Sequence, residues 1–185
     1  MRDWYTGRGL VPRVQTGIRS ELDREIAAAG FADADRPALR QVAALGPALK
    51  ILRGTADAGL KAELTTELPA DYCTVYRRGL SIAKFVPILT NGGALIRFAI
   101  VRGENGQALS VGRVALDGAT GYAGIAALAT AETARRRGFA RVILRDLLSF
   151  AADQGADSTY LEVEAGNAPA RALYISLTSS GSRPW

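Results

Sequence analysis

The segment between residues 122 and 164 restricts the fold of this chain more than any other part of the sequence. Tyr122–Thr130 is an apolar stretch typical of a buried strand, and Thr159–Glu164 predicts a second strand. Between them lies an amphipathic helix, whose apolar residues recur at helical spacing: Ile143, Leu147, Phe150 and Ala151. A strand, a helix and a strand in this order predict a right-handed crossover between two parallel strands.

An antiparallel hairpin is predicted before this crossover. Ala94–Val101 and Ala108–Leu116 are apolar strands separated by the turn Glu104-Asn105-Gly106, and Asp117-Gly118 makes the next turn. A short helix, Ala168–Leu177, follows the crossover. The predicted fold class is therefore α/β (α+β): a mixed, mostly antiparallel sheet flanked by helices, with one β-α-β crossover.

The earlier part of the chain gives weaker patterns. Ser20 is a plausible cap for a helix that ends at Gly30. One or two short strands are expected next, at Ala38–Leu45 and Leu49–Leu52. A helix through Tyr72–Arg78, closed by Gly79, and a short amphipathic piece, Ser81–Leu89, follow them. Asn91-Gly92-Gly93 is a turn signal before the hairpin.

Composition excludes several classes of protein. Of 185 residues, 48% are hydrophobic and 22% charged, which is typical of a globular domain with a core. No apolar run is long enough for a membrane helix, and acidic Asp3 argues against a signal peptide, so we predict a cytoplasmic protein with no membrane partner. The chain has no histidine and one cysteine, Cys73, which excludes Ser-His-Asp and Cys-His catalysis and argues against a metal site.

The formal charge of +5 favours an anionic ligand such as a nucleotide, a phosphate or nucleic acid. The basic residues are mostly arginines and are scattered, except at Arg135-Arg136-Arg137. No basic helix with interleaved aromatic residues is present, so we predict no nucleic-acid partner.

The loop before the amphipathic helix has the character of an anion site. Successive backbone N–H groups at a helix N-terminus point outward, with the positive end of the helix dipole behind them. Gly138 allows close approach of a diphosphate, and Ala140 is small enough for the helix to pack on the strand. The alternative is a solvated basic turn before an ordinary helix.

A second motif lies one helix later. Asn167 begins the last predicted helix, with Pro169 in its first turn. Tyr174 follows two helical turns along the same face. Each residue has an ordinary alternative, because Asn167 alone is typical of an N-cap and Tyr174 alone of a core aromatic.

Together the two motifs resemble the GNAT acetyltransferase superfamily. Arg135-Arg136-Arg137-Gly138-Phe139-Ala140 is similar to that family's Arg/Gln-x-x-Gly-x-Gly/Ala loop, and Asn167-Ala-Pro-Ala-Arg-Ala-Leu-Tyr174 is similar to its Asn-x-x-Ala-x-x-Leu-Tyr helix. The resemblance runs from about Ala94 to Leu177, with both motifs in the family's order.

The resemblance implies an acetyl-CoA-dependent N-acetyltransferase, in which a small amine or a protein or peptide amine attacks the acetyl group directly. It places the pyrophosphate of acetyl-CoA on the loop of Arg135, Arg136, Arg137, Gly138, Phe139 and Ala140. It places the pantetheine arm beside Leu128, Ala129 and Thr130, with Asn167 nearby. Tyr174 would then protonate the departing thiolate, and Cys73 would be a packing residue.

The sequence leaves the general base open. Glu132, Glu162 and Glu164 lie near the predicted site, and a chain of water molecules could serve as well. Glu132 lies in the predicted loop, where its side chain could simply be exposed to solvent. Glu162 and Glu164 share one strand face, which could simply face water.

The two ends depart from the family pattern. After Tyr174 the expected final strands are lacking, which predicts an exposed sheet edge unless another segment covers it, and suggests a homodimer. Near the start, Trp4-Tyr5-Thr-Gly-Arg8-Gly9-Leu10 resembles the close of a preceding unit in a tandem GNAT protein. We therefore expect a remnant at 1–30, a linker with short strands at 31–63 and a truncated GNAT domain at 64–185.

The alternative function is a non-catalytic GNAT-like module that binds CoA or a protein.

Overall fold

The computed structural model divides into two compact units, Met1–Pro37 and Ala38–Trp185. It describes residues 6–7, 14, 16, 20–32, 37–76, 82–90 and 95–177, and for 82–85 only the backbone. In the first unit, Ser20 caps helix α2 (Glu21–Ala28) by accepting a hydrogen bond from the Asp23 backbone N–H at 3.0 Å. Gly30 follows with a φ of 81°, so the predicted helix and its ends are confirmed.

The second unit is a six-stranded sheet with helices on both faces. Its strands, in chain order, are β1 (Ala38–Ala44), β2 (Glu63–Thr65), β3 (Leu95–Arg102), β4 (Ala108–Asp117), β5 (Tyr122–Thr130) and β6 (Ser158–Glu164). Its helices are α3 (Leu45–Thr55), α4 (Tyr72–Val75), α5 (Ile82–Thr90), the 3-10 turn η1 (Glu132–Ala134), α6 (Phe139–Asp153) and α7 (Ala168–Ile175).

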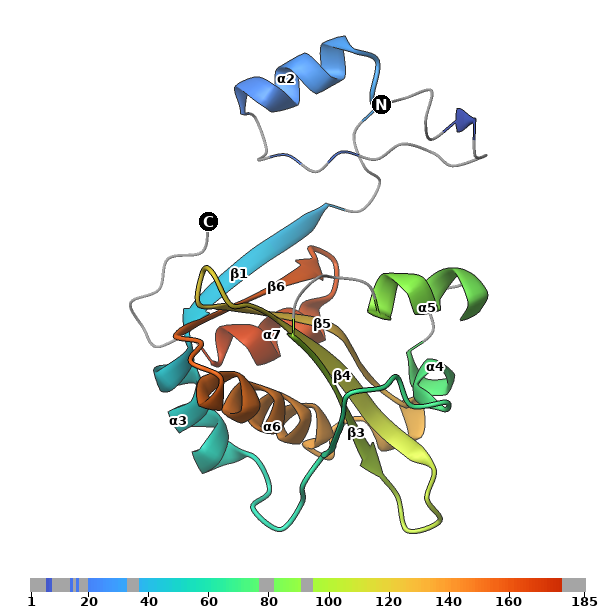
Figure 1. The fold of residues 1–185 in the computed structure, drawn as a ribbon, viewed down its shortest axis with the longest axis vertical. Coiled ribbons are helices and arrows are strands. Elements are labelled where there is room, and N and C mark those ends of the chain that lie inside the picture. Colours follow the sequence, from blue (N-terminus) through green and yellow to red (C-terminus); the bar gives the residue numbers. More distant parts are fainter. Residues whose placement is uncertain are drawn as a thin grey trace. The chain divides into compact units, whose positions relative to one another are not determined.

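The sheet has the order β1-β6-β5-β4-β3-β2, in which only β5 and β6 are parallel. Helix α6 connects these two strands, as the strand-helix-strand pattern predicts. Helices α3, α6 and α7 cover one face of the sheet, and α4 and α5 cover the other (Figure 1). The predicted mixed, mostly antiparallel α/β fold class is confirmed.

The expected strand Leu49–Leu52 is wrong, because these residues belong to α3. The buried residues of α3 recur at helical spacing, and all pack into the core beneath α6: Leu45, Ala48, Leu49 and Leu52. Pro47 is compatible with this helix, since it lies in the first turn, where a backbone N–H has no partner within the helix. Gly46, Pro47 and Gly54 therefore lie within a helix and do not form turns between strands.

Replacing Leu52 with alanine tests this correction. Leu52 is 0% exposed in the α3–α6 core, so we expect Leu52→Ala to lower the free energy of unfolding by about 2–5 kcal/mol. Ile88→Ala is the control, because Ile88 is 62% exposed on α5 and should cost less than about 0.5 kcal/mol. Urea unfolding measures both. An equally small effect of both substitutions would contradict a core position for α3.

The sheet edge expected to be exposed beside β6 is covered by β1. The two strands pair antiparallel along their full length, from Ala38 opposite Glu164 to Ala44 opposite Ser158. From the segment 31–63, expected as a linker with short strands, the residues from Ala38 on thus contribute β1, α3 and the start of β2 to the second unit. The assignment of residues 1–30 to a preceding unit stays a prediction.

Both helices expected before the hairpin are present, and the first of them is shorter than predicted. Helix α4 ends at Val75, so Tyr76 follows a helix that was expected to include it, while residues 77–79, with the expected stop at Gly79, lie outside the described residues. Helix α5 covers the described part of the expected piece Ser81–Leu89 and extends to Thr90, while Ser81 and the turn expected at residues 91–93 lie outside the described part. Of the helices that the structure describes, none combines the length and the apolar character needed to cross a bilayer.

Candidate functional site

Strands β5 and β6 pair only over their first residues, from Tyr122 opposite Ser158 to Ile125 opposite Leu161. Beyond this point β5 continues to Thr130 without β6 beside it, while β6 stays paired with β1. Three predicted site residues, Leu128, Ala129 and Thr130, therefore lie on a strand edge beside which the described part of the chain places no further strand. Such an edge can pair with an extended ligand through backbone hydrogen bonds.

A β-bulge lies where the two strands separate. The register between β4 and β5 shifts between Val111 and Arg113, and Ala127 has a φ of 51°. Tyr72 from α4 donates a hydrogen bond from its hydroxyl to the Ala127 carbonyl at 3.0 Å. Burial raises the pKa of Tyr72, so this hydroxyl stays protonated and can donate. Sequence reasoning missed this role of Tyr72, since nothing nearby in the sequence predicts its long-range partner.

Thr130 is tied into the sheet by its side chain. Ser110 is fully buried and donates from its hydroxyl to the Ala129 carbonyl at 3.0 Å. The Thr130 hydroxyl lies 2.9 Å from the Ser110 hydroxyl. Because the single Ser110 proton goes to Ala129, the Thr130 hydroxyl is the donor in this second bond. These bonds fix the end of the free β5 edge.

The loop from Arg135 to Ala140 forms a cradle of backbone N–H groups at the start of α6. Arg136 and Gly138 have positive φ angles of 65° and 81°. Within the described residues, none of the backbone N–H groups of residues 136–140 has a hydrogen-bond acceptor. Neighbouring N–H groups in such alternating conformations converge on an anion, and the α6 dipole adds positive potential. The geometry supports the predicted anion site.

The three arginine side chains of this loop are exposed. Arg135 lies 3.4 Å from Glu132, and the Arg137 guanidinium lies 4.9 Å from the centre of the Phe139 ring. Phe139 itself is buried in the core and anchors the start of α6. The cradle is therefore attached to the core at its base through Phe139 and carries exposed arginines at its rim.

Asn167 caps α7. Its side-chain oxygen accepts a hydrogen bond from the Ala170 backbone N–H at 3.2 Å, and Pro169 lies in the first turn. Asn167 is thus an N-cap in the structure, which is the ordinary alternative to a ligand-binding role. Its predicted contact with a ligand stays a prediction.

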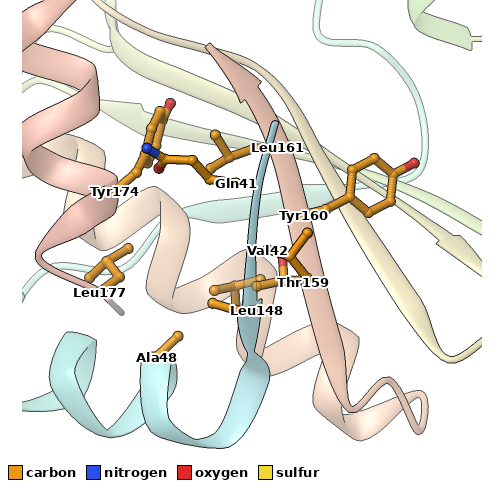
Figure 2. A pocket seen from close by; sticks show the side chains of 10 residues that line it. Gln41, Val42, Ala48, Leu148, Thr159, Tyr160, Leu161, Tyr174 and Leu177 are labelled. Carbon is orange, nitrogen blue, oxygen red and sulfur yellow. The ribbon is translucent and has the colours of Figure 1, made fainter. Parts of the chain in front are cut away.

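Tyr174 extends from α7 into a small apolar pocket of about 30 Å³, which Gln41 of β1 also lines. Its hydroxyl points away from the Ala48 and Leu177 side chains (Figure 2). Burial, with a smaller contribution from Tyr76, raises the pKa of Tyr174 to about 12. Among the described residues its hydroxyl has no hydrogen-bond partner, so it is a protonated donor available to a ligand.

The raised pKa of Tyr174 predicts a loss of stability at alkaline pH. Between its ordinary pKa of 10 and about 12, the unfolded chain releases the Tyr174 proton while the folded chain retains it. The free energy of unfolding should therefore fall as pH rises through this window, by about 1–3 kcal/mol more than in Tyr174→Phe. Urea unfolding of both proteins at about pH 9 and about pH 11 measures the difference. Equal losses in both would contradict the shift.

A second, larger pocket of about 340 Å³ lies on the opposite face of the sheet from α6. Small residues of β4 and β5 line it: Ala115, Gly124, Ala126 and Ala127. Ala38 and several larger side chains also line it: Tyr76, Arg113, Ile125, Tyr160, Glu162 and Glu164. A small polar molecule fits a pocket of this size and lining.

Two of the three candidate bases line this larger pocket. Glu162 and Glu164 come from β6, and Glu162 accepts hydrogen bonds from Arg40 of β1, the shorter at 2.8 Å. Glu132 is exposed in η1 and is paired with Arg135 in the loop. The structure thus separates Glu132 from the two carboxylates of the pocket.

Several solved structures share this fold. The chain matches a tandem GNAT protein from the clavulanic acid biosynthesis pathway with a TM-score of 0.67 and 17% identity, over 89% of this chain and 55% of that one. It matches a GCN5-related N-acetyltransferase from Kribbella flavida with a TM-score of 0.59 and 19% identity, over 88% and 60%. A functionally unknown conserved protein from Staphylococcus epidermidis ATCC 12228 matches with a TM-score of 0.56 and 12% identity, over 88% and 63%.

The chain therefore spans between about half and two thirds of the length of these three structures. No curated protein matches its sequence. The family model for the Acetyltransferase (GNAT) family matches residues 64–177, which include the β5 edge, the loop at 135–140, Asn167 and Tyr174. On this match, the chain belongs to the GNAT acetyltransferase family.

Proposed function

We propose that this protein is an acetyl-CoA-dependent N-acetyltransferase that acts on a primary amine by direct attack. Membership of the family implies an acyl-CoA cosubstrate. The observation that carries the proposal is the succession of two features: a β5 edge that ends at Thr130 unpaired with β6, and a cradle of N–H groups at residues 136–140 for which the described residues supply no acceptor. An extended arm ending in a diphosphate matches both features.

The residues present fit this cosubstrate. The pyrophosphate would bind the N–H groups at residues 136–140, with Arg135, Arg136 and Arg137 around it. The pantetheine arm would lie along Leu128, Ala129 and Thr130, where β5 is paired with β4 but not with β6. Asn167 holds the start of α7 and so sets the position of Tyr174.

When bound, acetyl-CoA supplies a thioester, whose C–S bond breaks as the amine nitrogen bonds to the acetyl carbon. Tyr174 gives its hydroxyl proton to the departing sulfur and regains one from water. Glu162 or Glu164 takes the proton that the amine releases, because both line the larger pocket. No enzyme nucleophile takes part, so Cys73 has no role in the reaction.

Acetyl transfer to a mixed panel of primary amines tests the proposal. We expect release of free CoA thiol and a matching acetylated amine, detected by mass spectrometry, from the folded chain with acetyl-CoA. A folded chain that binds CoA but acetylates no primary amine, including peptide N-termini and lysine side chains, would contradict the proposed activity. That outcome would favour the non-catalytic CoA-binding module.

A further inference from the structure

Arg113 contributes a guanidinium to the larger pocket, and no hydrogen-bond or ion-pair partner for it lies among the described residues. It lies on β4, between Gly112 and Val114, and its side chain lines the pocket. Its Nε is buried without a hydrogen-bond partner, and the structure gives Arg113 no ion pair within the described residues. A half-buried arginine remains charged, although burial lowers its pKa. A buried donor without an acceptor is costly, which indicates that a ligand supplies the acceptor.

The pocket has opposite charges on opposite sides. Arg113 pairs in register with Ala126 of β5, while Glu162 follows the last β6 residue that pairs with β5. The sheet order places β5 between the two, so the strands that carry these charges are at least about 9 Å apart, which is two interstrand spacings. Small side chains of β5 form the lining between them.

We infer that the acceptor amine carries a carboxylate, which binds Arg113 while the amine faces Glu162 and Glu164. This inference rests on the proposed function, because it names the class of its acceptor. A carboxylate matches the planar donor fork of arginine. A diamine would bring a second cation to Arg113 and leave its Nε without an acceptor.

Binding of matched ligand pairs tests this inference. The probes are α- and ω-amino acids of two to six carbons and the corresponding amino-acid amides, titrated calorimetrically into the full chain with CoA present. We expect at least one amino acid to bind about tenfold or more tightly than its amide. Arg113→Gln should abolish this preference, and Arg113→Lys should restore part of it. Arg53→Gln, an exposed arginine on α3, is the control that should keep it.

The results of these titrations either support or overturn the assignment of a carboxylate to Arg113. Amino acids and amides that bind equally, or a preference that survives Arg113→Gln, would overturn it, as would a folded chain that binds no member of the panel. Binding of carboxylates that depends on Arg113, without any acetyl transfer, would support the inference and contradict the proposed function alone. Circular dichroism of each variant shows that it is folded.

Discussion

Tyr174→Phe is expected to lower kcat for acetyl transfer by about 100- to 10,000-fold, with acetyl-CoA affinity changed little. The substitution removes one hydroxyl and leaves the ring that packs against the core. With its pKa raised to about 12, this hydroxyl is protonated throughout the neutral range and can donate to a thiolate. Steady-state kinetics with acetyl-CoA and the best acceptor measure the effect.

Two further tyrosine variants sharpen this test. Tyr122→Phe is the control, because Tyr122 is exposed at the start of β5, and its activity should equal that of the wild type. Tyr76 lines the larger pocket and raises the pKa of Tyr174. Full activity in Tyr174→Phe together with loss in Tyr76→Phe would assign the proton donor to Tyr76 instead.

Gly138→Val is expected to weaken acetyl-CoA binding by about 100-fold or more. The Gly138 φ of 81° is strained for a β-branched residue, and the new side chain would enter the space in front of the N–H groups. Loss of two charge-assisted hydrogen bonds to the pyrophosphate accounts for this magnitude. Equilibrium dialysis with labelled acetyl-CoA measures the affinity.

Gly155→Val is the matched control for this substitution. Gly155 follows the other end of α6, has a φ of 87° and, like Gly138, has no neighbouring atom near the position of a Cβ. Both variants should lose similar stability, but only Gly138→Val should lose affinity. Equal affinities in the two variants would show that the α6 cradle does not hold the pyrophosphate.

The strongest parts of the fold were predictable because their signals are local. The apolar period of α6, the turn between β3 and β4 and the residues around Gly138 each lie within a few residues of the structure they specify. The prediction for residues 45–55 was wrong for a related reason. Gly46, Pro47 and Gly54 are locally typical of turns, whereas the helix that contains them depends on packing beneath α6.

The features that the sequence did not reveal are long-range. The pairing of β1 with β6 joins segments more than a hundred residues apart, and nothing in Ala38–Ala44 specifies its partner. On β5 the bulge falls at Ala127, which is not a glycine, and Tyr72 reaches it from another element. Arg113 is an ordinary strand residue in the sequence, and only the fold places it across a pocket from Glu162.

Calorimetric titration of acetyl-CoA into the wild-type chain tests the central claim most directly. The free β5 edge and the N–H cradle predict saturable binding of one acetyl-CoA per chain, with a dissociation constant in the micromolar range. The full chain is used, with circular dichroism as the check that it is folded. The absence of saturable binding by a folded chain would contradict the assignment of this edge and cradle to acetyl-CoA.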